Sequence, residues 1–324
     1  MTIMRSIGVL AHPLRPYTFP LAESIAESLR QHDIATWVYT DWEESDVEDA
    51  VRQTQMIVAI GGDGAMLRAA RVSARHRVPV LGINMGQLGF LTEINGMGDW
   101  EHALKRLIDD DFWIEKRMMI RAQHIRDGEV LLYSDALNDV VISANVFGKM
   151  IHLDCHIDAD WATTYSADAL VVSSATGSTA YALSLGGPIL PPNLNNILIV
   201  PAAPHLSMER PIVLAEGSQV EITPTSRNRN KIVLTADGTQ LGNVVFGDVI
   251  RVQASEFVSS FVRLRGRNYF YRSLLDRLEP RYQRTYAEQH TIANTNQKVQ
   301  TTTMFEDHND KTGSETKSSS ANSD

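Results

Sequence analysis

The first third of the chain alternates short apolar runs with segments that have apolar residues at helical spacing. Four apolar runs predict β-strands, at residues 7–11, 35–39, 56–60 and 80–83. Three segments predict helices, at residues 21–31, 66–75 and 100–108. In the first of these segments Leu21, Ile25 and Leu29 recur at a spacing of four. Such alternation favours a Rossmann-like α/β domain with a parallel sheet and crossover helices, over residues 1–118.

After residue 118 the pattern changes to short, often β-branched runs separated by turn residues. These runs predict strands at residues 119–124, 130–133, 139–144, 150–157, 170–173, 197–200, 220–223, 232–235 and 249–253. Many short strands without intervening helices are typical of an all-β sandwich. We therefore place a β-sandwich domain at residues 119–265.

The last sixty residues predict a helix followed by a polar tail. Residues 269–278 have a helical pattern, and we expect the segment 266–286 to pack back on the first domain. Residues 287–324 are rich in Thr, Asn, Ser and Lys and carry little that could be buried, which predicts a disordered tail.

Composition narrows the classes of function. The 324 residues are 43% hydrophobic and have a formal net charge of −9, which disfavours nucleic acid as a partner. No apolar run approaches the ~20 residues of a membrane helix, so no membrane partner is expected. The single cysteine, Cys155, and the absence of a signal-peptide pattern fit a cytoplasmic location. An acidic protein that binds anionic ligands needs a local source of positive potential, such as backbone amides or a metal ion.

The strongest local signal is the sequence Gly61-Gly62-Asp63-Gly64 between a predicted strand and a predicted helix. Glycines allow close approach of a ligand to the backbone, and the helix N-terminus presents unpaired N–H groups. Together they predict a phosphate site that needs no lysine. The motif matches neither the P-loop nor the dinucleotide fingerprint.

Asp63 has two readings that the sequence leaves open. A carboxylate at the mouth of a parallel sheet could accept a proton from a hydroxyl group or hold a metal ion on phosphates. It could equally be the N-cap of the following helix in a tight turn.

Two further segments suggest ligand contacts and have structural alternatives. Gly82, Gly86 and Gly89 bracket a loop that ends in Phe90, which either stacks on a base or belongs to the core. Several hydroxyl residues surround Gly177, at positions 173, 174, 176, 178 and 179. They either contact a substrate or cap a short helix.

Metal chemistry has little support from the sequence. His152, Asp154, His156 and Asp158 share one face of a predicted strand, and a solvated polar face explains this alternation better than a metal site. His12, after the first predicted strand, could approach phosphates, but an ordinary loop histidine is the favoured interpretation. HExxH, paired CxxC and GxSxG motifs are absent, which excludes zinc-protease and α/β-hydrolase signatures.

Taken in order, the motifs resemble those of the NAD kinase family. The resemblance covers about residues 5–265 and is carried by GGDG (61–64), LGINMGQLGFLTE (81–93), ALNDVVI (136–142), TYSADALVVSSATGSTAYALSLGGPI (164–189), PHLSMERPIVL (204–214) and TADGTQ (235–240). GGDG alone is shared with lipid kinases and phosphofructokinase-like enzymes. The ATGSTAY stretch followed by GGP is much more specific to NAD kinases.

The resemblance implies an ATP-dependent kinase that phosphorylates the 2′-hydroxyl of the adenosine ribose of NAD. Asp63 is implied as the catalytic residue, beside that hydroxyl. The implied phosphate contacts of ATP are Gly61, Gly62, Asp63 and Gly64. The implied NAD contacts are Gly64, Phe90 on the adenine, Asn138 on the adenosine side, Asp139 and Asp168 on the nicotinamide-riboside side, and Thr176, Thr179, Ala180, Tyr181 and Ser184. His205 and Arg210 match a later motif and are given no chemistry.

The resemblance also implies Mg²⁺ bound through the phosphates, with Asp63 as a possible ligand, and a homodimer or homotetramer. The chain departs from the family pattern in having Ala65 in place of a threonine, Ala169 in place of a glycine and Ala175 in place of a proline. Asp139 replaces a glutamate. These departures leave open a weakly catalytic protein that binds NAD(P), and a lipid or sugar kinase is a second alternative.

Overall fold

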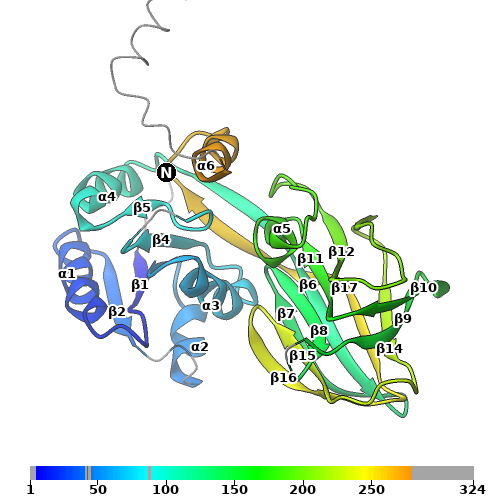
Figure 1. Cartoon of the computed structure of the whole chain (residues 1–324). Coiled ribbons are helices and arrows are strands. Elements are labelled where there is room, and N and C mark those ends of the chain that lie inside the picture. Colours follow the sequence, from blue (N-terminus) through cyan, green and yellow to red (C-terminus); the bar gives the residue numbers. More distant parts are fainter. Residues whose placement is uncertain (1–4, 41, 43–44, 87–88, 147, 279–324) are drawn as a thin grey trace, which may run out of the picture. The chain divides into compact units, whose positions relative to one another are not determined.

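The computed structural model describes residues 5–40, 42, 45–86, 89–146 and 148–278. The chain up to Phe270 forms one compact unit, and the residues from Tyr271 onward belong to a second. Figure 1 shows the order of the elements along the chain. The predicted tail at 287–324 lies outside the described residues.

The first part of the large unit is a parallel sheet with helices on both faces, as predicted. Its strands lie in the order β4-β3-β1-β2: β4 (Val80–Asn84), β3 (Met56–Ile60), β1 (Ser6–Leu10) and β2 (Ala35–Tyr39). All three neighbouring pairs are parallel. The α-helices are α1 (Thr18–Arg30), α2 (Ser45–Arg52), α3 (Asp63–Ala74) and α4 (Trp100–Ile108). A short strand, β5 (Ile94–Asn95), and a 3₁₀ turn, η1 (Met97–Asp99), precede α4.

Strand periodicity divides this layer into two cores. Val58 of β3 belongs to the core made with α1 and α4, whereas its neighbours Ile57 and Ala59 belong to the core made with α2 and α3. Successive side chains of a strand point to opposite faces of the sheet, so the two cores lie on opposite faces. All five residues of β3 are buried, which is typical of a parallel strand covered on both sides.

The second part of the large unit is a β-sandwich, as predicted. One of its sheets has the order β13-β12-β11-β8-β15-β16 and is antiparallel throughout. Its strands are β8 (Asp139–Ala144), β11 (Ala169–Ser174), β12 (Asn196–Ala202), β13 (Ile212–Ala215), β15 (Ile232–Ala236) and β16 (Thr239–Val244). The facing strands β9 (Ile151–Ile157), β10 (Asp160–Ala167) and β14 (Val220–Pro224) belong to the other sheet. Residues of both sheets share one hydrophobic core.

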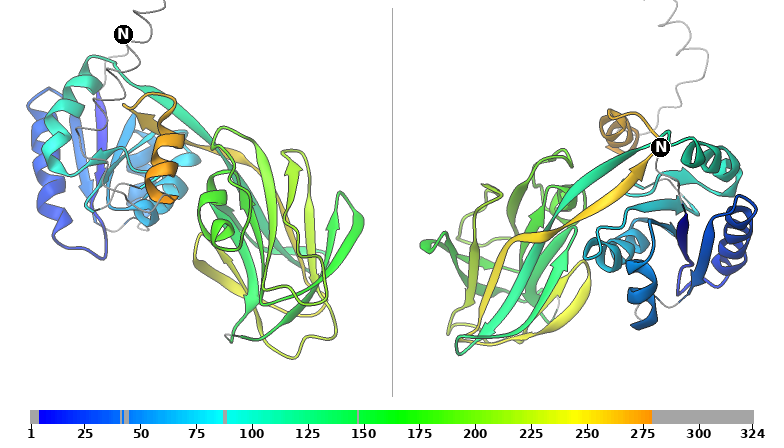
Figure 2. Two further views of the ribbon diagram at one scale, coloured as in Figure 1. Left: turned by 45° about the horizontal axis from the view of Figure 1, so that its top comes forward. Right: turned by 180° about the vertical axis from the view of Figure 1, so that it is seen from behind.

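Two long strands join the sandwich to the parallel sheet. Strand β6 (Trp113–Arg126) pairs with β17 (Val249–Arg263) along nearly its whole length, and they run side by side in Figure 2. β17 then pairs in parallel with β4 through Phe261 and Val80. Strand β7 (Glu129–Ala136) lies on the other side of β6. One sheet therefore continues through both layers, and position 118, the predicted boundary, lies within β6.

The alternation at residues 152–158 corresponds to the two faces of β9, and the polar face is half-buried rather than solvated. Leu153 and Cys155 of β9 are buried in the sandwich core, and burial raises the pKa of the Cys155 thiol to about 12. On the opposite face His152 bonds through Nδ1 to the Ser166 hydroxyl, and Asp154 accepts a hydrogen bond from Thr164. Two polar side chains of β9, His152 and Asp154, are therefore hydrogen-bonded to side chains of β10.

The C-terminal helix predicted at 269–278 is present as α6 (Tyr269–Leu278). Its first two residues belong to the large unit, and its remaining residues belong to the second. The packing expected for 266–286 stays a prediction, and residues 279–286 lie outside the described residues. In the part of the chain that the structure describes, no helix is long and apolar enough to span a membrane.

Candidate functional site

The glycine turn at 61–64 leads from β3 directly into α3, as the sequence predicts. Gly62 is the N-cap of α3 and Asp63 is its first residue, so Asp63 is not the cap. A Cβ atom on Gly61 would lie 2.5 Å from Cβ of Ala65, so the fold itself requires glycine there. A Cβ atom on Gly64 would meet nothing within 4 Å. Space beside the helix N-terminus is therefore open to a ligand.

The Asp63 carboxylate is bound by the backbone of a neighbouring loop. Its Oδ2 accepts a hydrogen bond from the N–H of Phe90 and its Oδ1 accepts one from the N–H of Leu91, both at 3.0 Å. A Cβ atom on Gly89 would lie 1.8 Å from Asp63 Oδ1, so Gly89 is needed for this close approach. An ionised carboxylate has about four acceptor positions, so Asp63 can still accept a hydrogen from a ligand hydroxyl.

A pocket of about 330 Å³ opens beside the glycine turn. It is lined by the loop after β1, the first turns of α3 and the β15–β16 turn, through residues His12, Pro13, Leu14, Arg15, Gly62, Gly64, Ala65, Leu67, Arg68, Arg71, Asp237, Gly238 and Thr239. Its three arginines give an acidic protein a local positive potential. We call it the phosphate pocket.

The arginines of α3 face the pocket because of helical spacing. Gly64, Arg68 and Arg71 are separated by four and three residues and so lie on one face of the helix. Arg71 donates from Nη2 to Thr239 Oγ1 at 3.3 Å, while its Nε is buried without a partner among the described residues. A guanidinium group with a free, buried donor suits a phosphate or carboxylate oxygen.

Two further side chains add donors near the turn. The His12 ring lies against Gly61, its Nδ1 accepts the N–H of Leu14, and burial together with nearby arginines lowers its pKa. The neutral ring therefore carries its proton on Nε2, where it is a donor. Asn84, at the end of β4, is 3% exposed and is the residue nearest to the Cβ position of Gly62. Its Nδ2 has no partner among the described residues.

Asp237 connects the phosphate pocket to the predicted NAD residues. It occupies the β15–β16 turn, and its carboxylate accepts hydrogen bonds from the N–H groups of Leu137, Asn138 and Asp139 at 2.8, 2.8 and 3.2 Å. Asp139 is 7% exposed, and burial together with the Asp237 charge raises its pKa to about 7. Burial also raises the pKa of Asp237, against the effect of the three amide donors.

The ATGST segment packs directly on Asn138. After β11 the chain turns through η2 (Thr176–Thr179) into α5 (Tyr181–Ser184). The Asn138 carbonyl accepts hydrogen bonds from Ser173 Oγ at 3.0 Å and from the N–H of Ser174 at 2.9 Å. A Cβ atom on Gly177 would lie 2.2 Å from the same carbonyl, which explains why glycine is required in this turn.

The hydroxyl groups of this segment mainly serve the backbone. Ser178 Oγ donates to the Ala175 carbonyl and accepts the N–H of Leu190, and Thr179 Oγ1 donates to the Thr176 carbonyl. Neither η2 nor α5 has a side-chain cap, so these hydroxyls do not cap the short helix as the structural alternative supposed. The contact of Thr179 with NAD stays a prediction. Tyr181, in contrast, is 43% exposed and free to contact a ligand from the surface.

The remaining predicted residues lie apart from the phosphate pocket lining. Phe90 is only 7% exposed, with its ring 6.1 Å from that of Phe270, so it offers an adenine ring little free surface in this conformation. Asp168 precedes β11 and bonds through its backbone to Ala202 and Ala144. Its contact with nicotinamide riboside stays a prediction, as do the assignments of Thr176, Ala180 and Ser184.

Two of the family departures have a local structural reading. Ala65 lines the phosphate pocket, so the missing hydroxyl lies beside the turn. Ala169 begins β11 and is not among the residues with positive φ, so alanine is unstrained there.

The described residues contain no cluster of three or more His, Cys, Asp or Glu side chains that could hold a metal ion. A divalent cation at this site would therefore depend on ligand oxygens for most of its coordination. This agrees with the expectation of a metal bound through phosphates, without testing it.

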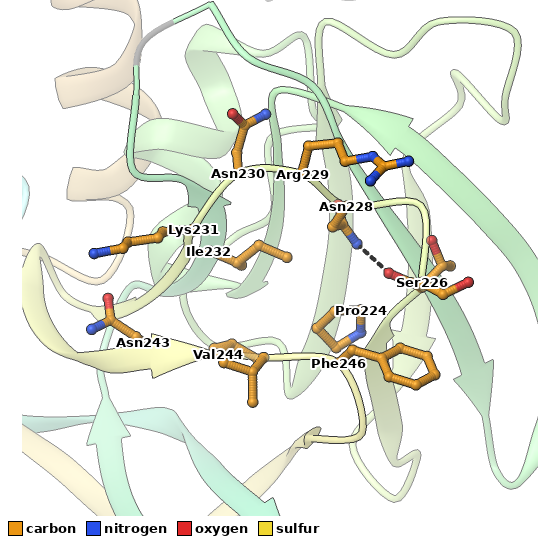
Figure 3. Close-up of a pocket in the computed structure, with 12 residues that line it drawn as sticks. Pro224, Ser226, Asn228, Arg229, Asn230, Lys231, Ile232, Asn243, Val244 and Phe246 are labelled. Atoms are coloured by element: carbon orange, nitrogen blue, oxygen red, sulfur yellow. Dashed lines mark hydrogen bonds between the residues drawn. The ribbon is translucent and has the colours of Figure 1, made fainter.

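A second pocket, of about 410 Å³, lies elsewhere in the sandwich (Figure 3). Lys231 and Asn243, at the open end of the β15–β16 hairpin, help to line it together with the exposed Phe246. The same hairpin reaches the phosphate pocket at its other end, through Thr239. None of the predicted site residues lines this second pocket.

Several residues of the site escaped the sequence analysis. Arg68 and Arg71 could have been found from their helical spacing after Gly64. Asp237 lies in the TADGTQ motif but was given no role, because Asp-Gly between two strands is an ordinary hairpin turn. Both Asp237 and Gly238 have positive φ, as such a turn requires. His12 lies in the loop after β1, as favoured from the sequence, and it also lines the pocket. Its approach to phosphates was the alternative left open, and it stays a prediction.

Comparison with known proteins gives consistent matches. A family model described as the ATP-NAD kinase N-terminal domain matches residues 13–112, and one described as the ATP-NAD kinase C-terminal domain matches residues 137–264. Proteins named NAD kinase from Heliobacterium modesticaldum and Chloroflexus aurantiacus are 38% and 36% identical to this chain. Each alignment covers 85% of this chain and 99% of the relative.

Two solved structures share the fold. A yeast NADH kinase complexed with NADH aligns with a TM-score of 0.75 and 22% identity, covering 88% of this chain and 91% of that chain. An NAD kinase from Archaeoglobus fulgidus in complex with ATP aligns with a TM-score of 0.66 and 24% identity, covering 84% of this chain and 97% of that chain.

Proposed function

This chain belongs to the NAD kinase family, and we propose that Asp63 and the phosphate pocket together perform its reaction. The enzyme transfers the γ-phosphoryl group of ATP to the 2′-hydroxyl of the adenosine ribose of NAD, giving NADP. The observation that carries the proposal is the position of Asp63, at the N-terminus of a helix whose next turns supply two arginines to an open pocket.

The phosphate pocket would receive the polyphosphate of ATP. Phosphoryl transfer depends mainly on positioning and on neutralising negative charge. The free N–H groups at the start of α3 and the guanidinium groups of Arg15, Arg68 and Arg71 supply fixed positive charge at one place. The buried and unpartnered Nδ2 of Asn84 is a further donor beside Gly62.

Asp63 would orient the ribose hydroxyl and accept its proton as the new bond to phosphorus forms. Two backbone amides fix its carboxylate, so little reorganisation is needed at the moment of transfer. The remaining acceptor positions of the carboxylate are available to the hydroxyl group.

The NAD side of the site would be built on the turn that follows β11. Asn138 and Asp139 are held against this turn by the Asp237 carboxylate and by Ser173 and Ser174. The exposed Tyr181 and its neighbours would extend this surface along the dinucleotide. Asp168 would serve the nicotinamide-riboside half.

We also propose Mg²⁺ as the cofactor and a homodimer or homotetramer as the assembly. The residues present fit a magnesium ion that is carried by phosphates, because Mg²⁺ is commonly bound through one or two carboxylates and substrate phosphates. Asp63 is the carboxylate at the turn itself. When bound, the ion would neutralise charge on the phosphoryl oxygens. Light scattering on the purified protein measures the subunit number directly.

The decisive experiment measures NADP formed from ATP, Mg²⁺ and NAD by the wild type and by Asp63→Asn. If Asp63 accepts the proton, the variant should lose at least about a hundredfold in turnover while NAD binding persists. Asp109→Asn, an exposed residue after α4, is the matched control and should keep wild-type rates. Wild-type turnover in Asp63→Asn would overturn the assignment. NAD(P) binding without any NADP from the wild type would indicate a non-catalytic protein.

A further inference from the structure

A cluster of buried charged residues lies behind the loop that holds Asp63. Its charged members are between 0% and 6% exposed: Glu93, Glu115, Arg117 and Arg263. Tyr269, which is 4% exposed, belongs to the same cluster. Burying charged groups is costly unless they are paired, so a cluster of this kind in a small core needs a reason. It contributes no side chain to the phosphate pocket.

Arg263 binds the carbonyl groups of the same two residues whose amides hold Asp63. Its Nη1 donates to the Leu91 carbonyl at 2.9 Å and its Nη2 donates to the Phe90 carbonyl at 3.3 Å. The N–H groups of Phe90 and Leu91 donate to the Asp63 carboxylate on the other side. The loop is therefore fixed between a buried guanidinium group and the carboxylate of Asp63.

The planar guanidinium group of Arg263 makes four contacts at once. Besides the two carbonyls, its Nε donates to Glu115 Oε2 at 2.8 Å, and its Nη1 lies 3.3 Å from Glu93 Oε2. The backbone N–H groups of Leu264 and Arg265 donate to the other oxygen of Glu93. Only a rigid fork of donors can satisfy this arrangement, and lysine cannot replace it.

The second arginine of the cluster reaches the other half of the site. Arg117 donates from Nε to Glu115 Oε2 at 3.0 Å and from Nη2 to the Tyr269 hydroxyl at 2.6 Å. Its Nη1 lies 3.5 Å from Thr176 Oγ1, in the turn that packs on Asn138. We call this turn, which contains Thr176, the NAD turn. Glu115 therefore joins Arg263, behind the loop that holds Asp63, to Arg117, behind the NAD turn.

The protonation of the cluster supports this arrangement. Burial alone would raise the pKa of Glu115, but the Arg117 and Arg263 guanidinium groups bring it below its ordinary value. Burial raises the pKa of Tyr269, so its hydroxyl keeps the proton that it donates to Glu115. Glu115 is thus an ionised acceptor shared by both arginines.

We propose that Arg263 and Arg117 are positioning residues that fix the catalytic carboxylate and the NAD turn relative to each other through Glu115. The proposal rests on the function proposed for Asp63. Arg263 acts on turnover, because it sets the loop that orients Asp63. Arg117 acts on NAD binding, because it supports Thr176.

The test compares Arg263→Lys and Arg117→Lys, which keep the charge and lose the fork. Arg263→Lys should lower kcat about tenfold or more and leave the KM for NAD within about twofold. Arg117→Lys should raise the KM for NAD more than it lowers kcat. Arg121→Lys is the matched control, since Arg121 lies on the same strand and pairs with Asp135 and Glu256 in a separate cluster. It should change neither constant.

A double-mutant cycle separates positioning from a general loss of structure. If Arg263 acts through Asp63, Arg263→Lys should have no further effect on kcat in the Asp63→Asn background. Losses that multiply in the double variant, or an unchanged kcat in Arg263→Lys, would overturn the proposal. If Arg263→Lys does not fold, Glu93→Gln loosens the same arginine and is measured in the same cycle. Full activity in Asp63→Asn, by contrast, would reject the proposed function instead.

Discussion

Two carboxylates in this enzyme are held in nearly the same way and have different surroundings. Asp63 accepts two backbone N–H groups at the start of α3, and Asp237 accepts three in the β15–β16 turn. Asp63 lies between Gly62 and Gly64, which line the phosphate pocket, whereas Asp237 lines that pocket itself and has the buried Asp139 beside it. Hydrogen bonds from backbone amides are therefore not enough to identify a carboxylate as the group that reacts.

The two carboxylates differ in how many acceptor positions remain available to a ligand. The three amide bonds of Asp237 fix the backbone of residues 137–139, so its charge is used within the protein. Asp63 makes two such bonds, in a turn whose glycines line the pocket, and so keeps one more acceptor position than Asp237 does. We regard Asp237 as a support for the NAD side and Asp63 as the group that meets the substrate.

The largest expected effect is on the pH dependence of the free energy of unfolding, and it arises from Asp139 beside Asp237. Burial and the neighbouring Asp237 charge raise the pKa of Asp139 to about 7, from an ordinary value of 3.8. Between these values the folded state keeps a proton that the unfolded state loses. The free energy of unfolding should therefore fall as the pH rises from about 4 to about 7, by roughly 3–4 kcal/mol in all, and level off above that.

Urea unfolding at several pH values measures this slope, and Asp139→Asn isolates the contribution. The variant should resemble the wild type near pH 4.5 and be more stable than it near pH 8. Asp160→Asn, at an exposed strand start, should leave the slope as it is in the wild type. An unchanged slope in Asp139→Asn would mean that Asp139 titrates normally in the folded protein.

The next effect tests the Asp63 side through Gly89. In Gly89→Ala the new methyl group would occupy the position of the Asp63 carboxylate, which must rotate away from the amides of Phe90 and Leu91. We expect kcat to fall about tenfold or more, because a small misplacement of a reacting group is costly. NAD binding should change much less. Steady-state kinetics and equilibrium titration give the two quantities.

Gly217→Ala is the matched control for this substitution. Gly217 lies in the loop between β13 and β14, where an added Cβ atom meets nothing within 4 Å. Its kinetic constants should equal those of the wild type. If Gly89→Ala keeps wild-type kcat, the contact between the loop and Asp63 does not set the reaction geometry.

The sequence allowed the fold class to be predicted because hydrophobic periodicity reports burial directly. The buried run at 56–60 and the alternation at 151–157 both appear as strands. The continuity of β17 was not predictable in this way. A bulge between Ala254 and Val258 interrupts its pairing with β6, so the apolar period breaks in the middle of one strand.

The site was predictable where backbone geometry dictates residue type and less so where side chains from distant elements meet. Gly61 and Gly177 are required by close contacts, and both belong to motifs that the sequence displays. Arg263, on β17, lies two hundred residues after Asp63 in the sequence. Its role depends on a strand pairing that joins the two layers, which no local pattern reveals.

The smallest expected effect is on the free energy of unfolding, and it concerns Ala175. This residue begins the turn that packs on Asn138, whose backbone Asp237 holds. Ala175 has φ −58°, close to the value that proline imposes, where the family pattern has proline. The preceding residue, Ser174, lies in β11, an extended conformation that a following proline favours. Ala175→Pro should therefore raise the free energy of unfolding by about 0.4–1 kcal/mol by restricting the unfolded chain.

Kinetics on the same variant complete the comparison of the two carboxylates. Stiffening the turn does not touch the loop that binds Asp63, so kcat should stay at the wild-type value while the stability measured by urea unfolding increases. The hydrogen bonds of Ser178 and Ser174 to the segment would remain, because they use the Ala175 carbonyl and the Asn138 carbonyl. A loss of stability in Ala175→Pro would mean that the backbone N–H of Ala175 is needed in the fold. A loss of kcat without a loss of stability would mean that the NAD turn must move during turnover. The part of the site supported by Asp237 would then contribute through its conformational freedom as well as through its fixed charge.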